Sequence, residues 1–318
     1  SPVVARFATP YINPLKIKVE VTDAYTHDEG KYYVSLAEFE CYESKSLNGI
    51  ANDAAYFTDG TFSELKPGVT IDDIAKIQNA FIQNIAAYLL SNKYSSEYRI
   101  HDYMPYRPVD DLAAELKTSQ YSQFENPTGI YFKANEDVVI FVGETYNEAL
   151  SLRVRDFGSS GNDYSYALSP GLNLITMKGK GNGYISYFTL NYQSAQTVKV
   201  HIASGAVNGY FDINRHSNQD GKKLLEGAVS EIMDVVGNKT HLAYAVASLR
   251  SQCSDQLHDL ITLYDSITSS QHTMMGLEKY GRTPRNHMFG RVVWSSFMFA
   301  DGYGAGFNDN TMGTVANL

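Results

Sequence analysis

The sequence predicts an α+β protein built from more than one domain. Between residues 128 and 204, apolar and polar residues alternate in short runs separated by turn-forming residues, a pattern typical of a β-sandwich or barrel. On both sides of this segment, apolar residues recur at helical spacing. A chain of 318 residues, 43% of them hydrophobic, is long enough to form two or three such units.

The first predicted element is a β-hairpin near the N-terminus. Residues 16–22 and 32–42 alternate between apolar and polar, and the polar residues 23–31 lie between them. Because an isolated hairpin is only marginally stable in water, we expect these strands to pair with further β-structure. Residues 44–69 contain Asn-Gly, Asp-Gly and Pro-Gly pairs, which indicate a turn-rich linker.

Two helices are predicted after this linker. One amphipathic helix, with room for a kink, extends from Thr70 to Ser91. Thr70 is its N-cap, and Asp72 and Asp73 lie in the first turn, where negative charge is favourable. A shorter helix occupies residues 108–117, because its first residue is a proline, which suits the first turn of a helix.

The strands of the sandwich follow at regular intervals. Turn signals such as Pro170-Gly171 and the glycine-rich residues 178–183 separate them. Six strands are predicted, at residues 130–133, 138–142, 149–154, 172–177, 184–190 and 198–203.

The last third of the sequence mixes helical and strand patterns. Apolar residues from Leu224 to Val236 recur at helical spacing, which predicts a helix. A strand at 242–249 and a long helix at 252–267 follow. The apolar stretch 291–299 then breaks into the glycine-rich residues 301–306.

Charge and hydropathy exclude two classes of partner. The net charge is −9, from 26 basic and 35 acidic residues, and no block of lysine or arginine is present. Nucleic-acid binding depends on clustered cations that displace counterions, so we expect no nucleic-acid partner. No run of about 18 apolar residues occurs, so we expect no membrane-spanning helix.

No complete catalytic or metal-binding motif is present. None of the eight histidines is followed by glutamate or has another histidine within five residues, so the HExxH pair of zinc peptidases is absent. No serine has the glycine spacing of a nucleophile elbow. Residues 212–220 alternate like a calcium loop, but His216 would occupy the first acidic position and Gly227 the bidentate one, so a helix-capping loop is predicted.

The cysteines and the chain ends leave two questions open. Cys41 and Cys253 are 212 positions apart, which fits two buried thiols or one long-range disulfide. The chain begins with Ser1 and Pro2, without a basic and apolar leader, and no helix or strand follows the glycine-rich segment near the C-terminus. We therefore expect a fragment at both ends.

Tyrosine is unusually abundant. The sequence has 24 tyrosines and 15 phenylalanines but a single tryptophan, Trp294. A tyrosine offers a flat apolar face and a polar tip, which suits sugar and peptide recognition and equally suits half-buried positions in a sandwich. Composition alone leaves both interpretations open.

Several segments, in order, resemble one enzyme family. Residues 64–70, 126–130, 136–142, 207–212, 276–282 and 298–308 are similar to enhancin-like zinc metallopeptidases, the mucin-directed peptidases of gut Bacteroidetes. The resemblance covers residues 57–318. Separately, residues 33–42 (YVSLAEFECY) resemble the closing strand of a discoidin-like sugar-binding sandwich.

The resemblance implies a specific domain order. Residues 1–45 would be the β-hairpin remnant of a discoidin-like sandwich and residues 46–125 a linker and helical connector. Residues 126–206 would form the antiparallel β-sandwich of the enhancin-like region. Residues 207–318 would begin a thermolysin-like (gluzincin) α+β peptidase lobe. In that family two histidines of HExxH and a downstream glutamate hold zinc, and the motif glutamate is the general base. The similarity ends before that motif, so we expect no catalytic residue, no metal ligand and no zinc in this chain.

The resemblance also suggests a substrate-binding segment. Peptidases of this fold hold the substrate backbone against an edge strand that precedes the zinc helix. Tyr303, Gly304, Ala305, Gly306 and Asn308 are the candidates, because glycine permits a close backbone approach. A glycine-rich turn that joins two elements remains the alternative.

The functional expectation follows from this kinship. The chain would be the non-catalytic N-terminal portion of a secreted or cell-surface zinc endopeptidase that cleaves O-glycosylated proteins, with a mucin-type glycoprotein or glycan as its partner. The alternatives are a stand-alone glycan-binding or adhesion module and a degenerate peptidase retained as a scaffold.

Overall fold

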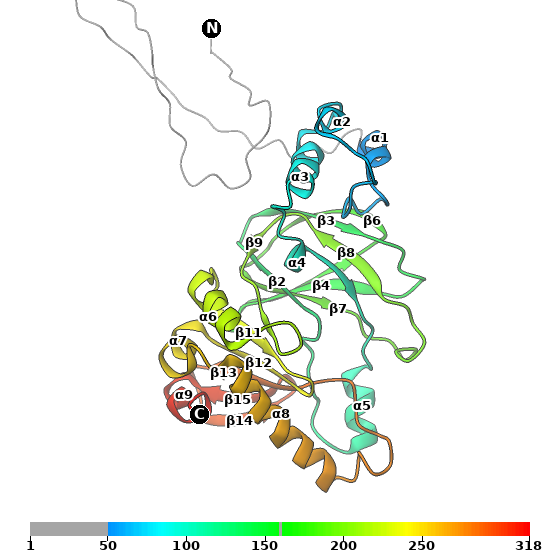
Figure 1. Ribbon diagram of the computed structural model, residues 1–318. Coiled ribbons are helices and arrows are strands. Elements are labelled where there is room, and N and C mark those ends of the chain that lie inside the picture. Colours follow the sequence, from blue (N-terminus) through cyan, green and yellow to red (C-terminus); the bar gives the residue numbers. More distant parts are fainter. Residues whose placement is uncertain (1–49, 159–160) are drawn as a thin grey trace, which may run out of the picture. The chain divides into compact units, whose positions relative to one another are not determined.

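The structure is a computed structural model that describes residues 50–158 and 161–318 (Figure 1). The predicted N-terminal hairpin, the discoidin-like strand and Cys41 lie outside the described residues. The chain divides into two compact units, one ending at Tyr94 and the other comprising Ser95–Leu318. No helix in the described ranges is both long enough and apolar enough to cross a bilayer.

The first unit is helical. Its elements are α1 (Ile50–Asp53), the short 3-10 helix η1 (Ala54–Tyr56), α2 (Ile71–Ile74) and α3 (Ala80–Leu90). Thr70 caps α2 through a capping box with Asp73, as predicted. The single helix predicted from Thr70 to Ser91, with room for a kink, is instead two helices, because the chain leaves the helical path between α2 and α3.

The break between α2 and α3 has a clear physical cause. The buried carboxylate of Asp53 accepts hydrogen bonds from the backbone N–H groups of Gln78 and Asn79, which a continuous helix would have used internally. The side chain of Asn79 then accepts from the N–H groups of Phe81 and Ile82 and caps α3. A carboxylate 25 residues upstream thus decides where the second helix starts.

The second unit begins with a β-sandwich. One sheet has the order β1-β8-β3-β6 and the other β5-β4-β7-β2-β9, and all of their strand pairs are antiparallel. The elements are α4 (Ser96–Arg99), β1 (Ile100–Tyr103), α5 (Val109–Leu116), β2 (Pro127–Phe132), β3 (Asp137–Val142), β4 (Leu150–Arg155), β5 (Asp163–Leu168), β6 (Gly171–Thr176), β7 (Gly181–Ser186), β8 (Val198–Ile202) and β9 (Ala206–Val207).

Alternating side chains from the two sheets form the core of the sandwich. In β4, for example, Leu150, Leu152 and Val154 are buried between the sheets, and the residues between them point to the opposite face. All six predicted strands are confirmed, with ends shifted by a few residues. β5 was not predicted, because its sequence DYSYAL shows little contrast between apolar and polar positions. β1 lies within the residues expected to form a connector, but it pairs with β8 of the sandwich.

A mixed sheet with helices completes the second unit. The strand order is β10-β11-β12-β13-β15-β14; the β11/β12 and β14/β15 pairs are antiparallel and the other pairs parallel. We call this part, residues 207–318, the lobe. Its elements are β10 (Phe211–Asp212), α6 (Asn218–Gly227), β11 (Ile232–Val236), β12 (Thr240–Ala245), α7 (Val246–Cys253), α8 (Leu257–Met274), β13 (Met288–Val293), β14 (Met298–Asp301), β15 (Gly304–Asn308), η2 (Asp309–Thr311) and α9 (Met312–Val315).

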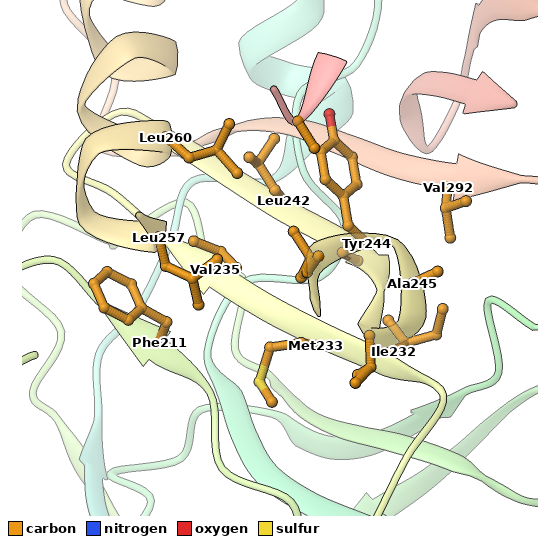
Figure 2. Close-up of a cluster of buried hydrophobic side chains, with 14 of the residues drawn as sticks. Phe211, Ile232, Met233, Val235, Leu242, Tyr244, Ala245, Leu257, Leu260 and Val292 are labelled. Carbon is orange, nitrogen blue, oxygen red and sulfur yellow. The ribbon is translucent and has the colours of Figure 1, made fainter. Parts of the chain in front are cut away.

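The core of the lobe lies between this sheet and its helices. Figure 2 shows Leu257 and Leu260 of α8 beside Val235 of β11 and Leu242 of β12, all of them buried. The strand predicted at 242–249 ends at Ala245, where α7 begins. The helix predicted at 252–267 begins later, at Leu257, and extends to Met274.

The prediction of a helix through residues 232–236 was wrong. These residues form β11, which pairs with β10 on one side and β12 on the other. A strand buried on both faces shows no alternation, so its apolar residues can coincide with helical spacing. Only α6 in this region is helical, and it ends at Gly227.

Cys253 is a buried thiol at the end of α7. Burial, with a smaller contribution from the charge of Asp255, raises the pKa of this thiol to about 11. Because the thiolate is the reactive form, we expect iodoacetamide to leave Cys253 unmodified at pH 8 and to modify it in urea. Peptide mapping by mass spectrometry measures both. Labelling of the native chain at the rate of an exposed thiol would contradict the expectation, and labelling in urea only after reduction would reveal a disulfide with Cys41.

Candidate functional site

The five candidate substrate-binding residues lie in and beside β15. Ala305 pairs with Gly290 of β13 on one side and with Ala300 of β14 on the other. The expectation that these residues offer an edge strand was therefore wrong, since both backbone edges of β15 are already used. Gly302 and Tyr303 form the turn that joins β14 to β15. Whether the five residues contact a substrate stays a prediction.

The outer strand of the lobe sheet is β14, whose surroundings are apolar. Phe297 is 72% exposed, Met298 is 58% exposed and Trp294 is 49% exposed. Two other side chains of β14 contact Arg291: the ring of Phe299 packs against its guanidinium, and Asp301 forms an ion pair with it. Among the described strands, β14 and β10 are the two at the ends of this sheet.

The side chains of Asn308 and Tyr303 are both engaged within the protein. The Asn308 side chain accepts a hydrogen bond from the N–H of Asn310 and caps the following turn. The ring of Tyr303 stacks on Phe124, with the ring centroids 5.8 Å apart. These contacts hold β15 at its first end, through the turn residue Tyr303, and at its last residue, Asn308.

A buried polar network joins the sandwich to the lobe. Asp234 of β11 accepts hydrogen bonds from the Tyr184 hydroxyl (2.8 Å) and the Asn182 amide (3.2 Å), both on β7, and its carboxylate contacts His241 Nε2 of β12 at 2.9 Å. Burial, followed by the charge of Asp234, raises the pKa of Tyr184 well above its usual value, so the phenol remains a donor. No motif in the sequence indicates this network, because its members come from two separate sheets.

A second buried pair connects the segment before β2 to the start of β13. Glu125 accepts from the backbone N–H of His287, and its other oxygen lies 2.7 Å from His287 Nδ1. Burial alone would lower the pKa of His287, but the charge of Glu125 and its hydrogen bond to the ring, with smaller contributions from Asp265 and Gly237, raise it overall.

The raised pKa of His287 makes stability depend on pH. A histidine with a raised folded pKa contributes its full stabilisation below the unfolded pKa of about 6.5 and loses it as the pH rises through the folded value. We therefore expect the melting temperature of the wild type to lose a component above pH 6.5 that the Glu125→Gln variant lacks. Thermal scans of both proteins across this range measure it. Identical pH profiles would contradict the role of the pair.

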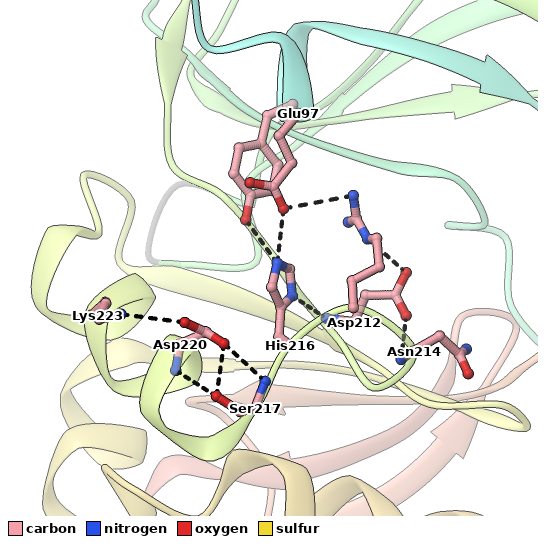
Figure 3. A network of polar contacts seen from close by, with 9 residues as sticks. Glu97, Asp212, Asn214, His216, Ser217, Asp220 and Lys223 are labelled. Carbon is pink, nitrogen blue, oxygen red and sulfur yellow. Dashed lines mark hydrogen bonds and ion pairs between the residues drawn. The ribbon is translucent and has the colours of Figure 1, made fainter. Parts of the chain in front are cut away.

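Residues 212–220 form the capping loop predicted from the sequence (Figure 3). Asp212 accepts from the N–H of Asn214, and Ser217 and Asp220 form a capping box at the start of α6. His216 Nδ1 accepts from the Asp212 N–H and its Nε2 lies 2.8 Å from Glu97 of α4. The acidic side chains are used in separate contacts, and within residues 50–158 and 161–318 no group of three or more His, Cys, Asp or Glu could hold a metal ion.

Comparison with known proteins identifies solved structures of the same architecture. No family model and no curated protein matches the sequence. A metallopeptidase from Bacteroides thetaiotaomicron matches with a TM-score of 0.77 and 30% identity, over 87% of this chain and 49% of the other. A metallopeptidase in complex with Tn antigen matches with a TM-score of 0.66 and 31% identity, over 71% of this chain and 44% of the other.

A more distant match shows the fold alone. The M60 catalytic domain of ZmpC from Clostridium perfringens, in complex with the sialyl T antigen, has a TM-score of 0.59 and 14% identity over 68% of this chain and 49% of the other. The present chain spans about half the length of each of these three structures. Since the likeness at 30% identity extends over 87% of the chain, and segments between residues 64 and 308 resemble enhancin-like peptidases in order, the chain is similar to enhancin-like metallopeptidases over most of its length.

Proposed function

We propose that this chain is the non-catalytic N-terminal portion of a secreted or cell-surface zinc endopeptidase that cleaves O-glycosylated, mucin-type proteins. The observation that carries the proposal is the likeness, at 30% identity, to about half of a metallopeptidase. A second related metallopeptidase is in complex with Tn antigen, which supports a glycosylated substrate. The discoidin-like resemblance of residues 33–42 supports contact between sugars and the N-terminal part of the chain.

The histidines of the described residues do not fit a zinc site. Four of them have separate partners: His216 contacts Glu97, His241 contacts Asp234, His272 contacts Tyr121 and His287 contacts Glu125. A peptidase zinc site needs nitrogen and carboxylate ligands around a single ion. We therefore assign no catalytic step to these residues, and in this proposal the zinc ligands belong to another part of the parent protein.

The structure suggests which strand would hold a peptide. Strand addition needs an outer strand whose backbone groups face away from the sheet, and β14 is such a strand in the lobe. Phe297 and Met298 would then contact the apolar side chains of an extended peptide. The glycines of β15 would support this strand from within the sheet, and Tyr303 would support it from the adjoining turn.

Two experiments test the proposed function. The DNA that follows the codon for Leu318 should encode HExxH and a downstream glutamate in frame, and a stop codon at that point would overturn the proposal. The present chain, incubated with an O-glycosylated mucin and Zn²⁺, should give no cleavage on a gel. Zinc-dependent cleavage by this chain alone would contradict its non-catalytic role.

One observation favours the alternative of a glycan-binding module. Tyr146, in the loop between β3 and β4, is 46% exposed and has a φ of 54°, and Asn147 beside it has a φ of 64°. Exposed aromatic rings bind sugar faces, and strained backbone is often found at functional sites. A glycan array with the whole chain and its Tyr146→Ala variant tests this, because the alternative requires binding that the variant loses.

A further inference from the structure

The turn between β14 and β15 is held by residues of the sandwich. The Gln123 amide, just before β2, donates a hydrogen bond to the carbonyl oxygen of Gly302 at 2.6 Å. The carbonyl oxygen of the same amide accepts from Arg153 of β4 at 3.0 Å. The Gln123 side chain thereby connects the tip of a lobe hairpin to a sandwich strand.

The ring of Tyr303 lies among three guanidinium groups. The guanidinium carbons of Arg155, Arg291 and Arg153 are 5.3, 5.4 and 5.8 Å from the ring centroid. Arg153 and Arg155 belong to β4 of the sandwich and Arg291 to β13 of the lobe. We call these three arginines the arginine cage. Because an aromatic face attracts cations, Tyr303 connects positive charge from both sheets.

The charges of the arginine cage are only partly neutralised by carboxylates. Arg153 makes a bidentate pair with Asp163 at 2.8 and 2.7 Å, and Arg291 pairs with Asp301 at 2.7 Å. Arg155 lies 3.8 Å from the already paired Asp163, and its buried Nε has no hydrogen-bond partner in the described residues. Each guanidinium also lies over a phenylalanine ring, but Tyr303 is the ring that all three share. Its π face supplies negative potential where burial makes positive charge costly.

We propose that Tyr303 is a positioning residue through which the sandwich fixes the place of β14. Asp301, the last residue of β14, accepts from the backbone N–H of Tyr303 at 2.8 Å and pairs with Arg291, which also lies over the Tyr303 ring. The consequence for peptide binding rests on the proposed function of β14. Binding there depends on Arg155 and Arg153, which need not touch the peptide.

The test combines two measurements on the whole chain and four variants. Hydrogen–deuterium exchange of the amides in residues 298–308 reports the placement of the hairpin, and titration with a synthetic Tn-bearing peptide reports binding. Tyr303→Phe keeps the aromatic ring, whereas Tyr303→Leu keeps an apolar side chain but removes the ring. Arg155→Met removes one cation of the arginine cage. Tyr166→Ala is the matched control, because Tyr166 is a half-buried tyrosine that packs against the sandwich core.

The expected results separate the cage from general destabilisation. Tyr303→Leu and Arg155→Met should each speed exchange in residues 298–308 by about tenfold and weaken peptide binding by a similar factor. Tyr303→Phe should match the wild type, and Tyr166→Ala should leave exchange at 298–308 unchanged. Wild-type exchange in both Tyr303→Leu and Arg155→Met would overturn the inference. If the wild type binds no peptide, the proposed role of β14 fails, and exchange alone still decides whether the cage places the strand.

Discussion

The Asp234→Ala variant is expected to lose about 3–5 kcal/mol of its free energy of unfolding, because removing one member of a buried charged network leaves its partners unpaired. Asp234 is buried, and its carboxylate contacts Tyr184, Asn182 and His241. Alanine would leave the Tyr184 hydroxyl and the Asn182 amide without this acceptor in a region closed to water. Urea denaturation followed by circular dichroism measures the loss.

The matched control for this prediction is Asp255→Ala. Asp255 is exposed in the turn between α7 and α8, so its removal should change stability by no more than about 0.5 kcal/mol. Equal losses of stability in the two variants would show that the network between the two sheets contributes no more than an exposed carboxylate. A larger loss of stability in Asp234→Ala than in Asp255→Ala would show that the contacts of this carboxylate between the two sheets stabilise the fold.

Gly304→Ala should destabilise the chain by at least about 2–3 kcal/mol, because the substitution combines backbone strain with a steric clash. Gly304 has a φ of 114°, a backbone angle that residues with a Cβ rarely adopt. A Cβ at this position would lie 2.4 Å from the carbonyl oxygen of Phe289. Since that oxygen belongs to the backbone of β13, the strand itself would have to move. Thermal unfolding of the variant measures the effect.

Gly306→Ala is the control in the same strand. There a Cβ would lie 3.0 Å from two ring atoms of Phe299, and the end of a side chain can shift where a backbone carbonyl cannot. We expect a loss clearly smaller than that of Gly304→Ala. If Gly306→Ala destabilised the chain more than Gly304→Ala, backbone strain and the close approach to β13 would not explain the need for glycine at residue 304.

The sequence predicted β4 well because apolar and polar residues alternate along it. The spacing of Leu150, Leu152 and Val154 is enough to identify β4 and its buried face. It failed at Ile232–Val236, where both faces of the strand are buried and no alternation remains. It also joined α2 and α3, because the effect of Asp53 on Gln78 and Asn79 spans 25 residues or more.

The role of the candidate substrate-binding residues stays a prediction. The resemblance pointed to Tyr303, Gly304, Ala305, Gly306 and Asn308, which lie in the β14–β15 turn and in β15. It could not show that β14, rather than β15, is the outer strand, because strand order depends on pairing between distant segments. The arginine cage was not foreseen either, since Arg153 and Arg291 are far apart in the sequence and carry no shared motif.

The sequence by itself determined the class of fold, six strands of the sandwich, the absence of an HExxH motif and the resemblance to enhancin-like peptidases. Only the tertiary structure decided what covers the outer face of β4 and β7. Alternation tells which side chains share a face, and it assigns Arg153, Arg155 and Tyr184 to the face away from the sandwich core. Whether water or protein lies there depends on another sheet, and here Tyr303 and Asp234 of the lobe meet these residues.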